Sequence, residues 1–289
     1  MDTNELLKRV RQIEIKTRVL SNNIFAGEYH SAFKGRGMSF SEVRDYQPGD
    51  DVRDIDWNVT ARFNHPYVKV YEEERELTVM LLIDVSSSLS FGTVNEFQRT
   101  MATEIAATLA FSAIQNNDKI GVILFSDKVE KYIPPKKGKK HILYIIREML
   151  DFKPDDTRTD IKQALEFMMN TQHKHCTAFL ISDFIAPDNY SQAVMIANRK
   201  HDLVAIQVYD RFMAALPDVG LIKVCDAETG HEQYIDSSSK RVRDAHAKHW
   251  LMLQGNLENT MNKSNVDMIS VRTDEDYAKA LINLFSKRK

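Results

Sequence analysis

Cysteine is scarce in this chain, where only Cys176 and Cys225 occur among 289 residues. Two thiols are too few for a disulfide framework, and both lie in apolar runs, so we expect reduced core residues. Long hydrophobic runs are missing as well, since no stretch approaches the ~18 consecutive apolar residues that span a bilayer. The N-terminus also lacks the apolar segment of a signal peptide. These absences predict a soluble, cytoplasmic protein with no transmembrane segment.

An excess of charge of one sign is also absent. The 39 Lys and Arg residues against 41 Asp and Glu residues leave a net charge of -2. Such a balance gives no long-range attraction to nucleic acid, and we expect no nucleic-acid partner. Walker A, G-x-S-x-G and H-E-x-x-H patterns do not occur, which argues against P-loop nucleotide binding, serine hydrolysis and zinc proteolysis.

Strand-like and helix-like segments alternate from about Leu77 onward. Apolar runs rich in β-branched residues predict the strands, and apolar residues at helical spacing predict the helices. We expect one strand near 129–133 to stop at Pro134-Pro135, and 219–225 and 232–235 to form a hairpin. The alternation is typical of an α/β fold, a doubly wound, mostly parallel sheet with helices on both faces. The other predicted strands cover 77–83, 120–125, 177–181, 203–208 and 266–270.

The first 76 residues have a different pattern. Val10, Ile13 and Thr17 share one face of a predicted helix, and basic residues occupy much of the remainder. Further on, the run 46–51 (Tyr-Gln-Pro-Gly-Asp-Asp) has the composition of a turn. We expect residues 1–76 to be an extension that packs against an α/β domain at 77–289.

The first candidate site residues follow the strand predicted at 77–83. Asp84 ends that strand, at the sheet edge where open α/β folds bind their ligands. Ser86 and Ser88 are two residues apart in the next loop, so their hydroxyls can point the same way. One carboxylate and two hydroxyls suit a hard cation such as Mg²⁺ or Mn²⁺, and not Zn²⁺ or copper.

Two further segments can add oxygen ligands to this edge. The strand at 177–181 leads to Asp183, which repeats the pattern of an apolar strand ending in an acid. Thr159 stands just before a predicted helix, where its hydroxyl can bind the ion or cap the helix. Ordinary turn chemistry is the alternative for Asp183. Together, five residues on three loops could surround one octahedral ion.

The order and spacing of these five residues resemble the metal-ion-dependent adhesion site of von Willebrand factor A domains, over about 77–289. The resemblance implies that Ser86, Ser88 and Thr159 contact the ion directly and that Asp84 and Asp183 act largely through water. It also implies that an acidic side chain of a binding partner completes the coordination. The chain departs from that family at Arg158, where many A domains have glycine.

A second motif lies in the N-terminal extension. It reads GRGMSFSEVRDYQPGDDVRDIDW at 35–57 and continues with Ala61-Arg62, and it closely resembles the signature of the DUF58 family. Members of that family resemble von Willebrand factor A proteins encoded beside MoxR-type AAA+ ATPases. The resemblance therefore implies a MoxR-type ATPase, its client protein, or both, as partners in the assembly or remodelling of other proteins.

The role of the segment 46–57 has two interpretations. We favour a structural clamp, in which Pro48-Gly49 form a turn, Arg53 pairs with nearby carboxylates and Trp57 packs with Ile55. A surface on which a partner docks is the alternative.

Three functions are compatible with these residues. The first is a non-enzymatic protein-binding module that depends on Mg²⁺ or Mn²⁺. The second is a phosphatase like the haloacid dehalogenases, in which Asp84 attacks phosphorus, but that chemistry needs a second acid at the position of Ser86. The third is a scaffold whose metal site stays empty. We favour the binding module.

Overall fold

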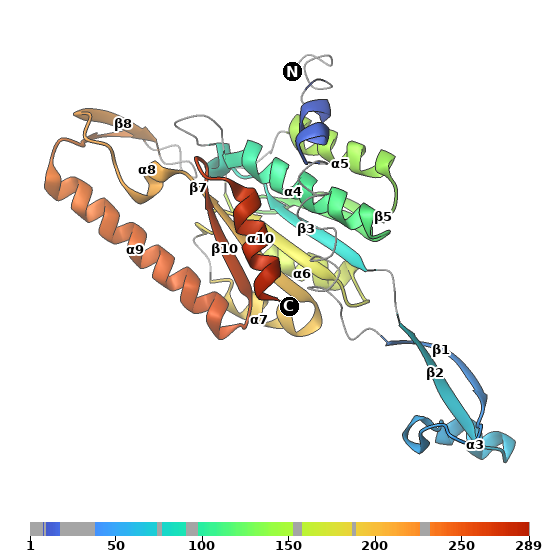
Figure 1. Ribbon diagram of the computed structural model, residues 1–289. Helices are drawn as coiled ribbons and strands as arrows, with labels where there is room; N and C mark the ends of the chain where they lie inside the picture. The colour runs from blue at the N-terminus through green and yellow to red at the C-terminus, as the bar shows by residue number, and fades with distance from the viewer. Residues whose placement is uncertain are drawn as a thin grey trace. The chain divides into compact units, whose positions relative to one another are not determined.

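The computed structural model describes residues 8, 10–17, 38–73, 77–90, 98–152, 158–186, 189–225 and 232–288 (Figure 1). The chain divides into two compact units, one made of Met1–Phe33 with Thr78–Lys289 and the other of Lys34–Leu77. The N-terminal residues thus group with the α/β unit, and the segment that carries the second motif is a unit of its own.

A six-stranded sheet forms the centre of the larger unit, in the order β10-β7-β6-β3-β4-β5. Neighbouring strands are parallel throughout, except that β5 runs antiparallel to β4. The predicted doubly wound, mostly parallel sheet is therefore confirmed. Its strands are β3 (Thr78–Asp84), β4 (Lys119–Phe125), β5 (Val129–Lys136), β6 (Thr177–Ser182), β7 (Asp202–Tyr209) and β10 (Asp267–Arg272).

Helices cover both faces of this sheet (Figure 1). One face carries α4 (Gln98–Gln115), α5 (Lys139–Asp151) and α10 (Tyr277–Lys287), and the other carries α6 (Ile161–Thr171), α7 (Ser191–Lys200) and α9 (Lys240–Lys263). Because both faces are covered, every residue of β6 is buried. The shorter elements are η2 (Ser87–Ser90), α8 (Arg211–Ala214) and the antiparallel pair β8 (Leu221–Cys225) and β9 (Glu232–Asp236).

The N-terminal helix packs on the outer side of the α4 layer. Val10, Ile13 and Thr17 are buried, as their shared helical face predicts. Two ion pairs of 2.6 Å attach the helix to the unit, from Lys16 to Glu104 of α4 and from Lys139 of α5 to Glu14. This cover explains why nearly all of α4 is buried. No helix in the described ranges is both long and apolar enough to cross a membrane.

One prediction about the sheet is wrong. The strand expected to stop at Pro134-Pro135 continues through both prolines to Lys136. Proline is tolerated there because β5 lies at the edge of the sheet, where a missing N–H breaks no ladder on the outer side. Gly121 makes room on β4, since a Cβ at that position would lie 3.0 Å from both Pro135 Cγ and Ile133 O.

The smaller unit is an antiparallel pair of strands with short helices between them. It contains β1 (Met38–Asp45), η1 (Val52–Asp54), α3 (Trp57–Phe63) and β2 (Tyr67–Glu73), with a bulge between Phe40 and Glu42. Among the side chains described in this unit, Val68 is the only buried hydrophobic one.

Candidate metal centre

Asp84 lies at the carboxyl end of β3, between the ends of β4 and β6. The register pairs Asp84 with Phe125 of β4 and pairs the preceding Ile83 with Ile181 of β6. The Asp84 side chain is fully buried, and each carboxylate oxygen accepts a hydrogen bond. The Ser86 N–H donates to Oδ1 at 2.9 Å and the Ser182 hydroxyl donates to Oδ2 at 2.7 Å.

Burial raises the pKa of Asp84, and the hydrogen bonds from Ser86 and Ser182 oppose that rise. The direction shows that the cost of removing the carboxylate from water exceeds what its hydrogen-bond donors return. A buried carboxylate of this kind gains strongly from a cation beside it.

The two hydroxyls of the D-x-S-x-S loop lie together. Ser86 Oγ and Ser88 Oγ are 2.9 Å apart, with Ser86 fully buried and Ser88 partly exposed. Because Ser86 N–H also binds Asp84, the loop turns back over the end of β3. Three of the predicted oxygen donors are therefore brought to one point of the sheet edge.

Thr159 comes to the same edge through the end of β4. The Asp160 N–H donates to the carbonyl of Ser126, directly after β4, at 2.8 Å. The preceding carbonyl, of Phe125, accepts from the Val85 N–H at 2.8 Å, so the end of β4 contacts both loops. Asp160 is also the cap of α6, since its carboxylate accepts from Gln163 N–H at 2.9 Å. The helix therefore does not need Thr159 as its cap.

The Thr159 hydroxyl therefore has no role in capping α6. Its side chain is 2% exposed, and Oγ1 has no hydrogen-bond partner among the described residues. Burying a hydroxyl without a partner costs about 1–3 kcal/mol. Coordination of a cation by this hydroxyl oxygen would offset that cost.

Asp183 follows β6, the strand next to β3, and is 1% exposed. Its Oδ1 accepts from Ile185 N–H at 3.0 Å, so the turn chemistry considered for this residue is present. Phe184 then adopts a φ of +60°, which is rare for a bulky side chain. Gln207 of β7 fixes the same turn by donating to Asp183 O at 3.3 Å, and Ser270 of β10 donates to Gln207 at 2.8 Å.

The structure thus brings all five predicted residues to the carboxyl edge of the sheet, on three segments linked by hydrogen bonds. The sequence did not single out Ser182 or Gln207, because their roles depend on which strands are neighbours. Among the described residues there is no cluster of three or more His, Cys, Asp or Glu side chains that could hold a metal. A cation here would rest on two carboxylates and three hydroxyls (Asp84, Asp183, Ser86, Ser88 and Thr159), a donor set that suits Mg²⁺ or Mn²⁺.

The turn predicted at Pro48-Gly49 is confirmed, and the Asp50 N–H closes it by donating to Gln47 O at 3.0 Å, but the side chains that hold it differ from those predicted. Arg44 donates two hydrogen bonds of 2.7 Å to Asp50, which also accepts from Gln47 N–H at 2.8 Å. These bonds lower the pKa of Asp50 and raise that of Arg44. Arg53 is exposed and contributes its backbone N–H to Asp51, and Trp57 is 66% exposed. The predicted roles of Arg53 and Trp57 were therefore wrong.

Replacing Arg44 with alanine should open the smaller unit to proteases while the α/β unit stays intact. The Arg44–Asp50 pair closes the turn around Gly49 (φ +112°), and Val68 is the only buried hydrophobic side chain among those described in this unit. Limited trypsin and chymotrypsin digestion followed by mass spectrometry would locate the cuts. Arg53→Ala is the matched control, and equal cleavage of both variants would contradict the role given to Arg44.

Comparison with known proteins gives a family and several relatives. Residues 42–252 match the family described as "Protein of unknown function DUF58". The chain is 29% identical over 293 residues to "Uncharacterized protein Rv1480" of Mycobacterium tuberculosis, with 100% of this chain and 92% of that protein covered. It is 28% identical over 109 residues to "Uncharacterized protein YeaD" of Bacillus subtilis, with 38% of this chain and 25% of that protein covered.

Among solved structures, the chain is similar to an aerotolerance-related membrane protein from Bacteroides fragilis. The identity is 16%, the TM-score is 0.49, and the match covers 73% of this chain and 99% of that one. A second similar structure is the SpRpn10 VWA domain, with 10% identity, a TM-score of 0.39 and coverage of 73% and 95%.

Proposed function

We propose that this chain, which belongs to the DUF58 family, is a protein-binding module whose recognition site contains a divalent cation. Asp84, Ser86, Ser88, Thr159 and Asp183 would hold Mg²⁺ or Mn²⁺ at the carboxyl edge of the sheet. A carboxylate of the partner would complete the coordination. The proposal includes the cytoplasmic location expected from the sequence.

The buried Thr159 hydroxyl is the observation that carries this proposal. Asp160 already caps α6, and no described residue bonds to Thr159 Oγ1. The chain therefore buries a polar group at an energetic cost, at the same edge of the sheet as the Asp84 carboxylate, whose pKa is raised by its own burial. A cation would offset both costs at once, whereas a purely structural loop would offset neither.

The protein's own residues have separate tasks in this proposal. The three hydroxyls offer neutral oxygens, and the two acids supply the negative charge. When bound, the cation would supply one coordination position for an acidic side chain, as the resemblance to the adhesion site of von Willebrand factor A domains implies. Ser182 and Gln207 are positioning residues, since they hold Asp84 and the Asp183 turn.

The partner that we propose is a MoxR-type AAA+ ATPase, its client protein, or both. The support for this assignment is the DUF58 motif at 35–62 and the family resemblance. Recovery of such an ATPase with the purified chain in Mg²⁺ and its loss in EDTA is the expected result. Equal recovery in both buffers would argue against a metal-dependent partner.

Thr159→Val separates a metal ligand from a structural residue. Without metal, the variant should be more stable than the wild type by about 1 kcal/mol, because an unsatisfied hydroxyl is removed. In isothermal titration calorimetry, its affinity for Mn²⁺ should fall at least tenfold, since one of the oxygen ligands is lost. Asp160→Asn, which keeps an acceptor for the α6 cap, is the control and should bind Mn²⁺ as the wild type does. Equal Mn²⁺ affinity in Thr159→Val would contradict the assignment.

A phosphatase is less compatible with the structure. Both oxygens of Asp84 accept hydrogen bonds, and no second carboxylate stands at the position of Ser86. An attacking carboxylate needs an acid that protonates the leaving group, and Ser86 cannot supply it. Rapid Mg²⁺-dependent hydrolysis of p-nitrophenyl phosphate that is lost in Asp84→Asn would overturn our choice.

A further inference from the structure

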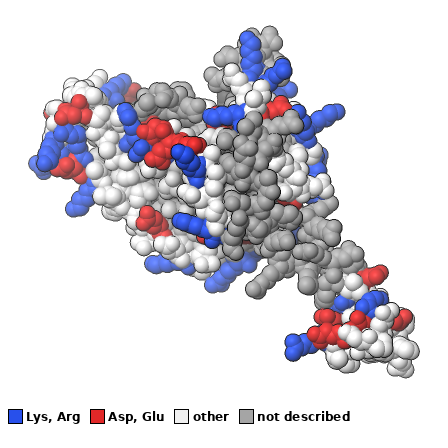
Figure 2. Space-filling model, viewed as in Figure 1, with Lys and Arg blue, Asp and Glu red and all other residues white. Residues whose placement is uncertain are grey.

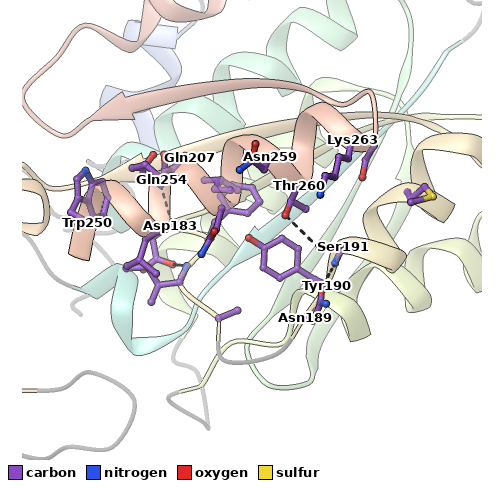
Figure 3. A pocket seen from close by; sticks show the side chains of 18 residues that line it. Asp183, Asn189, Tyr190, Ser191, Gln207, Trp250, Gln254, Asn259, Thr260 and Lys263 are labelled. Carbon is purple, nitrogen blue, oxygen red and sulfur yellow. Dashed lines mark hydrogen bonds between the residues drawn. The ribbon is translucent and has the colours of Figure 1, made fainter. Parts of the chain in front are cut away.

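A pocket of about 570 Å³ opens beside the candidate metal centre (Figure 3). One wall is α9, from Trp250 to Lys263, and the opposite wall is made of residues 183–186 and 189–191, the last of which begins α7. We call this the α9 pocket. The Ser191 and Thr260 hydroxyls, 3.4 Å apart, join its two walls.

The α9 pocket and the metal centre share residues. Asp183, Phe184 and Gln207 line the pocket, and Gln207 also holds the Asp183 turn. In Figure 3, Asp183 lies toward the end marked by Trp250, and Lys263 lies at the opposite end. A ligand group bound at Asp183 therefore lies toward the Trp250 end of the pocket.

The polar side chains that line the pocket are mostly neutral. They are amides and hydroxyls, namely Asn189, Gln207, Gln254, Asn256, Asn259, Tyr190, Ser191, Thr260 and Ser264. Amides and hydroxyls can each donate and accept hydrogen bonds, which is what the alternating N–H and C=O groups of an extended peptide require. Phe184, Trp250 and Leu257 add apolar surface for its side chains.

Charge marks the two ends of the pocket. Among the described residues that line it, Lys263 is the only cation and Asp183 the only carboxylate. The face shown in Figure 2, by contrast, has acidic and basic side chains interspersed. A ligand that fits would carry a carboxylate near Lys263 and, at the metal end, a second carboxylate for the cation.

The length of the wall sets an upper limit to the spacing of those carboxylates, because Asp183 lies between its two ends (Figure 3). From Trp250 to Lys263 the helix advances by 13 residues, about 20 Å at 1.5 Å per residue. An extended chain covers that distance in about six residues at 3.3 Å each. The pocket is thus long enough for a short peptide segment.

We propose that the α9 pocket binds an extended segment of the partner protein that carries two acidic residues at most about six positions apart. One acid reaches the cation beside Asp183, the backbone lies along α9 among the amides, and the second acid pairs with Lys263. This inference rests on the proposed function for the first acid, whereas the α9 contacts and the Lys263 pair are additional to it.

A random twelve-residue peptide display library, panned on the full chain in Mg²⁺, is the probe. Enriched peptides should contain two acids at the expected spacing. Synthetic versions of these peptides should bind the Lys263→Met variant about tenfold more weakly than the wild type. EDTA should weaken their binding to both proteins. Lys248→Met is the control, since Lys248 is an exposed lysine of the same helix outside the pocket. In a Trp57→Phe background, binding should shift the emission of Trp250, which lines the pocket.

The possible failures are distinguishable. Peptides that need Mg²⁺ but have one acid and ignore Lys263→Met would overturn the pocket proposal and leave the metal centre standing. Peptides that respond to Lys263→Met but not to EDTA or Asp84→Ala would overturn the metal-dependent function and with it the two-acid segment. A library with no peptide sensitive to Lys263→Met would overturn the inference outright.

Discussion

Replacing Asp84 with asparagine should raise the thermal stability of the protein in EDTA and abolish the stabilisation that Mg²⁺ provides. In the metal-free protein the buried Asp84 carboxylate has a raised pKa, so its ionised form at neutral pH costs folding free energy. Asparagine has the same shape without the charge. Its oxygen can accept from Ser86 N–H, and its amide can donate to the Ser182 hydroxyl in place of the present bond.

Relative to the wild type, Asp84→Asn should be more stable in EDTA, but it should lack the stabilisation that the wild type gains from Mg²⁺. Removing an uncompensated buried charge should add about 1–3 kcal/mol in EDTA. For the wild type, Mg²⁺ at roughly 100 times its dissociation constant should add about 2.7 kcal/mol, and for Asp84→Asn it should add nothing. Each kcal/mol moves the midpoint by about 2–4 °C in a domain of this size, so calorimetric scans with and without Mg²⁺ resolve both effects.

Asp84→Ala is the variant with which Asp84→Asn should be compared. It also removes the charge, but it leaves Ser86 N–H and the Ser182 hydroxyl without an acceptor, so its gain in EDTA should be smaller or negative. Lower stability of Asp84→Asn in EDTA would contradict the cost assigned to the buried charge. If Mg²⁺ stabilises Asp84→Asn as much as the wild type, the carboxylate has no part in binding a cation.

The second large effect is a loss of stability in acid caused by His201. This side chain is 1% exposed, at the start of β7, and its Nδ1 lies 3.3 Å from Cys176 Sγ. Burial lowers the pKa of His201 from 6.5 to about 4, and the charges of Lys200 and His175 act in the same direction. Burial also raises the pKa of the Cys176 thiol to about 12, so this pair is neutral at physiological pH.

The sign follows from proton uptake. Between pH 6.5 and 4 the unfolded chain protonates this imidazole and the folded chain does not, so protons favour unfolding. The folding free energy is not reduced by His201 above pH 6.5. As the pH falls from 6.5 toward 4, the neutral, buried imidazole costs the protein stability, about 3 kcal/mol for the full shift in pKa. Asp84 acts oppositely, because its raised pKa favours the folded state in acid.

Urea unfolding of the wild type and His201→Gln at pH 7.5 and pH 5 measures this contribution. The wild type should lose about 2 kcal/mol more than the variant on acidification, because most of the titration lies above pH 5. His249→Gln, an exposed site in α9, should follow the wild type. Equal losses in wild type and His201→Gln would show that this imidazole does not resist protonation.

Periodicity and strand chemistry predicted the α/β unit well. The apolar runs that became β3, β4, β6 and β7 are continuous because these strands are covered on both faces, which makes them easy to recognise. The end of β5 was missed because the rule that proline stops a strand does not hold at a sheet edge. Whether a strand lies at an edge depends on the order of the strands, which local sequence does not state.

The candidate site shows a similar division. Asp84 and Asp183 could be identified because each ends an apolar strand, and Ser86 and Ser88 because they follow at fixed spacing. The role of Thr159 was open between helix cap and ligand until the structure assigned the cap to Asp160. In the smaller unit, Arg44 and Arg53 are equally plausible partners for a carboxylate by sequence, and the fold of the turn selects Arg44.

The sequence by itself determined the kinds of oxygen donors, their positions at strand ends and the alternation that produces a parallel sheet, because all of these depend on neighbours along the chain. Only the tertiary structure decided that β6 lies beside β3, that Ser182 binds Asp84, and that α9 forms a pocket next to Asp183. Those relations join residues far apart in sequence, and they arise from the burial of the whole sheet.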